Sequence, residues 1–423
     1  MKVLIVNGSP KGDHSITLHT CLYIKKHFPD HDFEVVHAGQ RSGPLLKDLS
    51  PLTEKMRQAD LILFSYPVYT FLVPSQLHAL MERMKEEKIS FEGKFMTQVT
   101  TSKHFYDVTA HRFMEENCAD LGMICLPGLS ADMEDLLGEK GRRQALDFFR
   151  NVCWRMAGKP ALSPEKGPFD IVIVTDLKEE DTGLKEKISL LKDCLSGMRV
   201  RVENLRDFPF AGGCIGCMNC APDGKCIYRD GFDTYLREKI QRADAIVYAF
   251  TVRDHSMGSL FKKYDDRQFC NGHRTVTAGS PLAYIVNGDL SCEENLRMLL
   301  KARADMGGNY LAGTGVDEAS IRDTARCLSY ALERNYQVPR TFYGVGGSKI
   351  FRDLIFQMQG FMKADHKFFK QHGLYDFPQK RKGTILGMYL AGSLFSNDKL
   401  RKKAAPQIRE GMISSYRKVL KDF

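Results

Sequence analysis

The sequence predicts an α/β fold made of two tandem parallel sheets and a helical C-terminal segment. Three observations support this prediction. Short apolar runs alternate with helical patterns through residues 1–157. Several short stretches recur further along the chain at a nearly constant offset. A stretch rich in Pro and Gly, residues 158–168, separates the two copies.

Five apolar runs mark the expected strands of the first copy: residues 3–6, 33–36, 61–66, 95–100 and 123–126. Helical patterns separate them, one beginning near Ser15 and others covering residues 75–88 and 106–121. Strands that alternate with helices form parallel sheets covered on both faces. We therefore expect an open, doubly wound sheet.

The second copy repeats the first with one change of offset. Residues 3–6 match 171–174 at an offset of 168, whereas residues 59–62 match 243–246 at 184 and 119–122 match 304–307 at 185. The offset therefore jumps by 16 residues between the first and third strands. The predicted domains are residues 1–157, 168–337 and 338–423. The last contains an apolar helical pattern at 351–370 and a basic amphipathic helix at 400–420, interrupted near Pro406.

Length and composition point to a multidomain cytoplasmic protein. A chain of 423 residues is too long for a single core. The first residues do not resemble a signal peptide, and no apolar run reaches the ~18 residues of a membrane span. Twelve cysteines in such a chain indicate a reducing compartment, where thiols act as ligands or as buried apolar side chains.

The net charge of +9 is confined to the C-terminal segment. Residues 361–423 hold 14 basic and 5 acidic side chains, and the rest of the chain holds 47 of each. The excess is open to three interpretations: a solvated helical face, a docking surface for an acidic electron carrier such as ferredoxin, or contact of residues 384–403 with anionic lipid. Nucleic acid is not expected, because aromatic residues are not interleaved with the basic ones.

Four cysteines lie within thirteen residues, with the spacing C-x2-C-x2-C-x5-C: Cys214, Cys217, Cys220 and Cys226. They fall where the offset jumps, so the second copy carries an inserted cysteine loop. Four thiolates on a short loop with glycines suit a cubane iron–sulfur cluster. A single zinc ion is the alternative, although the spacing is more compact than the paired C-x2-C of zinc ribbons. A loop without metal is also left open.

The loop after the first strand, residues 7–17, is rich in glycine and hydroxyl groups. Its candidate ligand-binding residues are Gly8, Ser9, Pro10, Ser15 and Thr17. It matches neither the nucleoside-triphosphate loop nor the dinucleotide fingerprint. Backbone N–H groups beside a helix N-terminus suit a phosphate monoester such as that of FMN. The simpler alternative is a helix start capped by Ser15.

An aromatic loop, Pro67, Val68 and Tyr69, follows the third strand, and Thr101 and Ser102 end the fourth. In an open α/β sheet, ligands bind outside the carboxyl ends of the strands, so this loop could cover a flat ring. The alternative is that its aromatic residues plug the sheet edge. For the histidines and arginines nearby, we expect surface or loop-capping roles at His14 and His104 and structural ion pairs at Arg83 and Arg267.

Together these motifs resemble the flavodoxin-like NADPH-dependent FMN reductase family, and in particular its iron–sulfur flavoprotein branch. The resemblance covers about residues 1–335, in two copies. It implies that residues 8–17 hold the FMN phosphate, that residues 67–69 hold the isoalloxazine ring, and that the four cysteines hold a [4Fe–4S] cluster. Flavin N5 would carry the chemistry, and no catalytic side chain is implied.

The second copy departs from the family pattern at both flavin loops. Residues 175–181 include four carboxylates where the phosphate loop is expected, and these would repel a phosphate dianion. Arg253 stands where the first copy has Tyr69. We therefore expect FMN in the first copy and the cluster in the second.

These inferences predict an FMN-dependent oxidoreductase that passes electrons from NAD(P)H or ferredoxin to a small-molecule or protein acceptor. Two alternatives remain: an NAD(P)H-dependent quinone or FMN reductase with structural cysteines, and a non-enzymatic electron shuttle. A homodimer is compatible with either.

Overall fold

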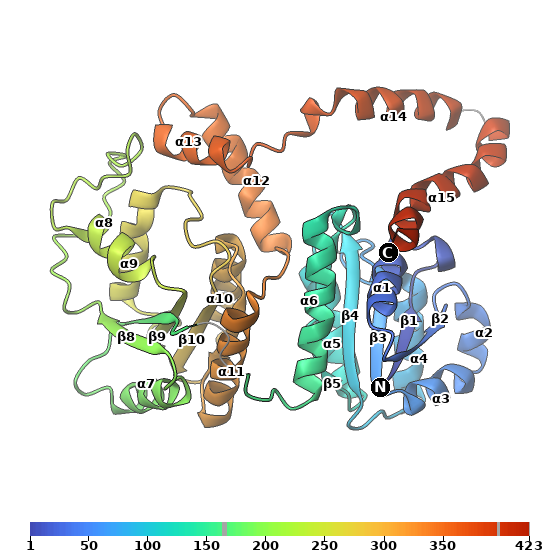
Figure 1. Cartoon of the computed structure of the whole chain (residues 1–423), viewed down its shortest axis with the longest axis horizontal. Coiled ribbons are helices and arrows are strands. Elements are labelled where there is room, and N and C mark those ends of the chain that lie inside the picture. Colours follow the sequence, from blue (N-terminus) through green and yellow to red (C-terminus); the bar gives the residue numbers. More distant parts are fainter. Residues whose placement is uncertain (163–166, 396–397, 423) are drawn as a thin grey trace. The chain divides into compact units, whose positions relative to one another are not determined.

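The computed structural model describes residues 1–162, 167–395 and 398–422. It divides into two compact units (Figure 1). Unit 1 comprises Met1–Gly158 with Phe377–Phe423, and unit 2 comprises Lys159–Asp376. The end of the chain therefore belongs to the unit that the beginning of the chain forms.

Unit 1 is built on a parallel sheet whose order is β2-β1-β3-β4-β5. Its strands are β1 (Lys2–Asn7), β2 (Asp32–Val36), β3 (Leu61–Pro67), β4 (Phe95–Ser102), β5 (Ile124–Cys125) and β6 (Leu129–Asp132). The predicted fifth strand is shorter than expected, because Pro127 lacks an N–H group and ends β5. The chain then pairs with β4 again as β6.

Helices cover both faces of this sheet. One core forms where α1 (Ile16–His27) and α6 (Glu139–Met156) pack on the strands, and the other where α3 (Ser50–Gln58), α4 (Ser75–Glu86) and α5 (Asp107–Asp120) pack. A short helix, α2 (Ser42–Lys47), precedes α3. The central strands β1 and β3 are mostly apolar and buried, because helices cover both faces of the sheet.

Unit 2 repeats this topology. Its sheet follows the order β8-β7-β9-β10-β11, with β7 (Asp170–Thr175), β8 (Arg199–Asn204), β9 (Ala245–Thr251), β10 (Leu282–Asn287) and β11 (Leu311–Gly315). Its helices are α7 (Thr182–Cys194), α8 (Phe232–Tyr235), α9 (Ser259–Arg267), α10 (Glu294–Gly307) and α11 (Glu318–Arg334). Strand β7 lies 168 residues after β1 and β9 lies 184 after β3, so the inserted residues fall between β8 and β9. The fold is thus α/β with two doubly wound parallel sheets.

The C-terminal residues form four helices that are divided between the units. Unit 2 includes α12 (Phe342–Gln357) and α13 (Lys363–Gln371), and unit 1 includes α14 (Lys382–Phe395) and α15 (Asp398–Lys421). The expected interruption at Pro406 is absent, since α15 continues through it. Proline removes one helical hydrogen bond, and the burial of Ile413 and Tyr416 against unit 1 compensates for that loss.

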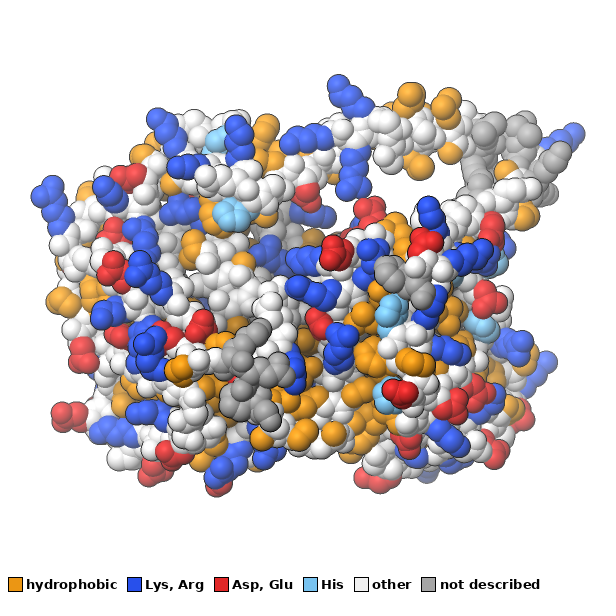
Figure 2. All heavy atoms as spheres, in the orientation of Figure 1, with side chains coloured by type: hydrophobic (Ala, Val, Ile, Leu, Met, Phe, Trp, Pro, Cys, Tyr) orange, Lys and Arg blue, Asp and Glu red, His pale blue; other side chains and the backbone are white. Residues whose placement is uncertain are grey.

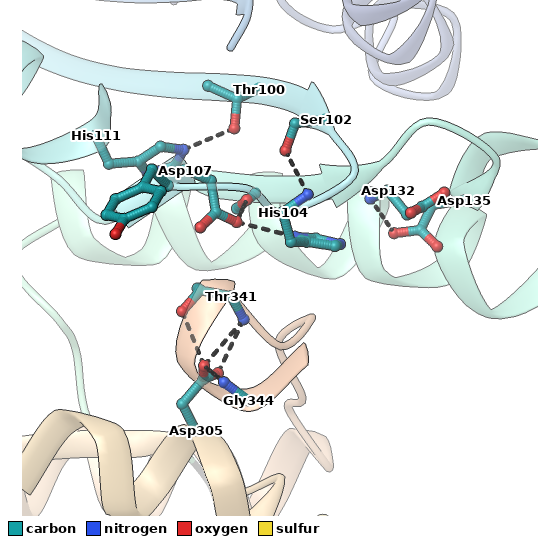
Figure 3. Close-up of polar contacts among 12 residues, drawn as sticks. Thr100, Ser102, His104, Asp107, His111, Asp132, Asp135, Asp305, Thr341 and Gly344 are labelled. Atoms are coloured by element: carbon teal, nitrogen blue, oxygen red, sulfur yellow. Dashed lines mark hydrogen bonds and ion pairs between the residues drawn. The ribbon is translucent and has the colours of Figure 1, made fainter. Parts of the chain in front are cut away.

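Hydrogen bonds attach these helices to the units. The Tyr416 hydroxyl donates to the backbone oxygen of Met133 at 2.7 Å in unit 1. In unit 2, the Asp305 carboxylate accepts hydrogen bonds from the backbone N–H groups of Thr341 and Gly344 at the start of α12 (Figure 3). None of the helices in the described part of the chain is long and apolar enough to cross a membrane.

Candidate functional site

The predicted flavin-binding residues converge at the carboxyl edge of the unit 1 sheet. Strands β1, β3 and β4 all end there, because Asn7 pairs with Ser65 and Pro67 pairs with Thr101 in parallel register. The loops that follow these strands therefore begin side by side. This edge is where open α/β sheets bind ligands.

The loop after β1 is tightly folded. Ser9 and Ser15 are buried, and Ser15 caps α1 by accepting from the Leu18 N–H at 3.4 Å. Thr17 is also buried and shares a 2.6 Å hydrogen bond with Thr101 on β4. A Cβ at Gly8 would lie 2.6 Å from a methyl carbon of Leu77, so a larger residue there requires Leu77 to move. The helix cap predicted as the simpler alternative is present, because Ser15 caps α1.

Asn7, which the sequence analysis did not single out, braces this loop. Its side-chain amide donates to the Gly12 oxygen at 3.1 Å, and its side-chain oxygen accepts from the Ser9 N–H at 3.2 Å. The backbone of Gly39 approaches so closely that a Cβ there would lie 2.2 Å from the Gly8 oxygen. The approach of Gly39 to Gly8 joins two loops that are distant in the sequence, so the sequence alone carries no signal for it.

The aromatic loop after β3 forms a tight turn. The Tyr69 N–H donates to the Leu72 oxygen at 2.8 Å, and the Leu72 N–H donates back at 3.1 Å. Thr70 and Phe71 take positive φ angles of 44° and 74° to close it. Pro67 and Val68 are half-buried, whereas Tyr69 is exposed. The turn thus presents one aromatic face to solvent at the sheet edge.

A second group of aromatic rings lies beside this turn. Phe71 packs on Phe105 and Tyr106, with ring centroids 5.3 and 4.8 Å apart. The Thr109 hydroxyl on α5 donates to the Phe71 oxygen at 2.6 Å and so joins the two loops. Phe71 and Phe105 remain exposed, so they do not plug the sheet edge.

The loop after β4 contains a buried acid–histidine pair (Figure 3). His104 Nδ1 lies 2.9 Å from a carboxylate oxygen of Asp107, which also accepts from the Ser130 hydroxyl at 2.6 Å. The Ser102 hydroxyl accepts from the His104 N–H at 2.8 Å. His104 is therefore a buried, oriented side chain and not the surface or loop-capping residue that we expected.

Two histidines lie at this sheet edge, His104 and His111, and a hydrogen bond orients the ring of each. His111 Nε2 bonds to the Thr100 hydroxyl at 2.8 Å, and burial lowers the pKa of His111 to about 4. His14, by contrast, is a surface residue 3.6 Å from Glu410, as the sequence suggested.

The corresponding edge of unit 2 has the same turn with different side chains. Arg253 and Ser256 exchange backbone hydrogen bonds of 3.0 and 2.6 Å, and the residues between them take positive φ angles, as in the Tyr69 turn. The Arg253 guanidinium reaches the carboxylates of Asp176 at 2.5 Å and Asp181 at 3.1 Å. Asp176 is buried, and at the offset of 168 it replaces Gly8.

The four clustered cysteines line one cavity of about 150 Å³ in unit 2. All four are free thiols, with Cys214 and Cys217 exposed and Cys220 and Cys226 partly buried. Burial raises the pKa of Cys220, and the other three thiols raise it further because they lie close by. Among the described residues, no group of three or more His, Cys, Asp or Glu side chains is placed to hold a single metal ion.

Two nitrogen atoms in the walls of this cavity are buried without a hydrogen-bond partner: Arg267 Nε and His273 Nδ1. Arg267 is fully buried, forms a two-bonded ion pair with Asp230 at 2.7 and 2.8 Å, and lies beside Cys226. The structural ion pair expected at Arg267 is thus present. Arg83 likewise pairs with its neighbours Glu86 and Glu87, on the surface of unit 1.

Helix α13 closes one side of the cysteine cavity. Asp365 is buried there and accepts from the His273 N–H at 2.6 Å, and the Ala364 N–H donates to the oxygen of Ala221 at 3.2 Å. Asp365 and Met362 both line the cavity. Sequence analysis missed these residues, because they lie almost 140 positions after the cysteine loop.

The donor set suits a cubane cluster better than a single ion. A tetrahedral zinc ion, with Zn–S bonds of ~2.3 Å, requires thiolates roughly 4 Å apart. In a cubane each thiolate binds a different iron, so the four sulfurs are spread more widely. Inorganic sulfides would also offer acceptors to the two nitrogen atoms that have no partner, and such unpaired buried groups are costly otherwise. The residues present therefore fit an iron–sulfur cluster.

Comparison with known proteins identifies the family of the first domain. Residues 1–133 match the family model described as NADPH-dependent FMN reductase. An iron–sulfur flavoprotein of Clostridioides difficile (strain 630) is 35% identical over 139 residues, which are 30% of this chain and 61% of that protein. The chain therefore spans less than two thirds of that relative. Residues 1–133 form a domain of the NADPH-dependent FMN reductase family, which confirms the predicted resemblance for this part of the chain.

Solved structures with some similarity include two proteins described as reductases. An FMN-dependent NADH-azoreductase from Bacillus anthracis, in complex with FMN, is 15% identical, with coverage of 37% of this chain and 100% of that chain and a TM-score of 0.29. An NADPH-quinone reductase from P. pentosaceus is 18% identical, with coverage of 36% and 97% and a TM-score of 0.29.

Proposed function

We propose that this chain is an oxidoreductase that binds FMN at the carboxyl edge of the unit 1 sheet and a [4Fe–4S] cluster in the cysteine cavity of unit 2. The observation that carries the proposal is the division of the two candidate sites between two units of the same topology. Unit 1 has the hydroxyl-rich loop and no cysteine motif, whereas unit 2 has the cysteine cavity and a loop occupied by carboxylates.

The FMN assignment is supported by the way the loop after β1 is built. The Ser9 hydroxyl would donate to the phosphate, and Gly8 and Pro10 would shape the loop around it, next to the N-terminus of α1. Ser15 and Thr17 line the same turn, although their hydroxyls also bond within the protein. The side chain of Asn7 stabilises this loop by hydrogen bonds to Gly12 and Ser9.

The ring of the flavin would lie between the loop that follows β3 and the loop that follows β4. Pro67, Val68 and Tyr69 would pack on one side of it, and Thr101 and Ser102 would offer polar contacts at the other. His104, oriented by Asp107, would lie close to this edge. When bound, FMN supplies hydride and single-electron transfer and the cluster supplies single-electron transfer.

The proposed electron donor is inferred from the family of the first domain. The family of residues 1–133 supports NAD(P)H as donor, and the name of the C. difficile relative supports the cluster. Ferredoxin is the other donor that we propose, and the acceptor would be a small molecule or a protein. A homodimer is compatible with this scheme.

Analysis of anaerobically purified full-length protein tests the proposal. We expect FMN, iron and acid-labile sulfide together, with about four irons for each flavin. Cys217→Ser should lower the iron content severalfold, and Cys292→Ser is the matched control because Cys292 is an exposed thiol of unit 2 that does not line the cavity.

Other outcomes would decide between the alternatives. Zinc in place of iron, or unchanged NAD(P)H oxidation by protein freed of iron, would contradict a redox role for the cysteines and favour a quinone or FMN reductase. Stoichiometric FMN and iron without turnover of any small acceptor would favour an electron shuttle. Absence of FMN would overturn the proposal altogether.

A further inference from the structure

Helix α14 is apolar and exposed along the part whose side chains are described. Five large apolar side chains of this helix face solvent: Ile385, Leu386, Met388, Tyr389 and Leu390, with exposed fractions of 41% to 72%. None of them belongs to a hydrophobic cluster of the described residues. Figure 2 shows hydrophobic side chains along this helix and basic side chains near it.

The apolar surface is too wide for a helix that packs on the protein by one face. At 100° per residue, positions 385 to 390 cover more than half of the helix circumference. A helix that packs on a core usually has an apolar stripe of ~100°. An apolar helix of this kind is stable in water only when another surface covers it.

Charge indicates what that surface is. Lys380, Arg381 and Lys382 are exposed at the N-terminal end of α14. The sequence from Phe377 to Asn397 contains no carboxylate, and further basic residues follow between Lys399 and Lys403. Basic residues beside an apolar segment are attracted to anionic lipid headgroups, so an anionic bilayer surface complements both the charge and the apolar side chains of this segment.

We propose that α14 docks the protein on an anionic lipid surface by lying in the plane of the membrane interface. Fourteen residues of helix extend ~21 Å, which is shorter than the ~30 Å hydrocarbon core. The helix would therefore lie on the membrane and not cross it. Tyr389 would sit at the level of the headgroups, and the basic side chains would reach the lipid phosphates.

A second copy of the chain is a poorer occupant. Basic residues flank α14 on both sides in the sequence, so pairing with another α14 in either direction would place like charges together. The attachment of α14 to unit 1 also leaves it accessible. Its N-terminal end is held by an exposed ion pair, Arg381 to Glu134 at 3.4 Å, which contributes little stability and would not prevent contact with lipid.

Vesicle binding by the full-length protein tests this inference independently of any cofactor. The probes are vesicles of phosphatidylcholine alone and of phosphatidylcholine mixed with phosphatidylglycerol, with sedimentation as readout. We expect binding to the mixed vesicles that weakens at high salt and is low on the neutral ones. Leu386→Ser with Leu390→Ser should lower the partition coefficient more than about tenfold.

Matched variants separate the two parts of the interaction. Lys380→Gln with Lys382→Gln should weaken binding to the mixed vesicles by about fivefold for each charge, without changing binding to neutral vesicles. Ile350→Ser is the control for loss of an exposed apolar side chain, since Ile350 lies on α12 and is 67% exposed. A Leu390→Trp reporter should shift its emission to the blue only with the mixed vesicles.

Three results would overturn the inference. One is equal binding of the wild type and the leucine variant to the mixed vesicles. Another is a dimer in solution that the leucine variant dissociates, without vesicle binding, which would make a second copy the occupant. The third is a monomer that binds no vesicle while the Leu390→Trp emission is already blue-shifted, which would place α14 against the protein itself.

Discussion

The two units share a fold and a turn but differ in what lies at the carboxyl edge of the sheet. In unit 1 the turn begins with the exposed ring of Tyr69. The neighbouring loop, residues 7–17, contains hydroxyl groups, and none of its buried residues is a carboxylate. In unit 2 the same turn carries Arg253, which the carboxylates of Asp176 and Asp181 hold. In unit 2 an internal ion pair occupies the edge that we propose binds the phosphate of FMN in unit 1.

The largest effect should come from breaking the ion pair of unit 2. Arg253→Tyr restores the side chain of unit 1 but leaves the buried Asp176 without its main partner, which should cost about 3 kcal/mol of unfolding free energy. Denaturant unfolding followed by circular dichroism measures this cost. Trp154, the only tryptophan of the chain, lies in unit 1, so its fluorescence should report an unchanged transition.

The double variant Asp176→Asn with Arg253→Tyr serves as the control for that experiment. It removes both charges, so it should recover most of the lost stability. If the single and double variants are equally destabilised, the ion pair is not what holds this edge of unit 2.

The next effect should come from adding a carboxylate to unit 1. Ser9→Asp places a negative charge in the loop after β1, as in unit 2, and should weaken FMN binding about 100-fold through repulsion of the phosphate. Titration of the flavin-free protein with FMN measures the affinity. Ser90→Asp adds the same charge at an exposed position just before β4, at the opposite edge of the sheet, and should leave the affinity unchanged.

A pH effect should distinguish the units as well. Because burial lowers the pKa of His111 to about 4, the unfolded chain binds the proton more tightly than the folded one between pH 4 and 6.5. Unit 1 should therefore lose about 3 kcal/mol as pH falls through this range, and the contribution is fully present above pH 6.5.

Unit 2 has Leu296 at the corresponding position, so His111→Leu makes the units alike. Tryptophan fluorescence during denaturant unfolding should show a flatter pH dependence for this variant than for the wild type. Equal slopes for both proteins would contradict the assigned role of His111.

The smallest effect concerns the wall of the cysteine cavity. His273→Phe keeps the ring that packs on Phe351 but removes the nitrogen that has no partner. If that nitrogen donates to a cluster sulfide, the reduction potential should fall by about 60 mV, equivalent to about 1.4 kcal/mol for one electron. Potentiometric titration followed by electron paramagnetic resonance measures this. An unchanged potential with normal iron content would contradict this contact alone.

Much of the fold could be predicted because local patterns of apolar residues determine where its strands and helices lie. Apolar runs of strand length located nearly every strand, and the offsets of 168 and 184 located the insertion. The same offset of 184 relates the Tyr69 turn to the Arg253 turn, down to the positive φ angles. The interruption expected at Pro406 was wrong, because tertiary packing of α15 on unit 1 overrides local propensity.

The candidate sites were only partly predictable. Residues in sequence motifs, such as the four cysteines, were found from their spacing. Asn7, Asp107 and Asp365 were not, because each makes a contact with a residue distant in the sequence, which no local pattern encodes: His37, Ser130 and His273, respectively. The role of His104 was underestimated for the same reason, since its burial depends on Asp107 and Ser130 together.

The central claim is that the two cofactors are divided between the units, and parallel flavin and iron analysis of two variants tests it most directly. The account predicts that Ser9→Asp protein loses FMN and keeps its iron and sulfide, whereas Cys217→Ser protein loses iron and keeps FMN. Retention of a full complement of FMN by the Ser9→Asp variant, or two FMN molecules per wild-type chain, would contradict it.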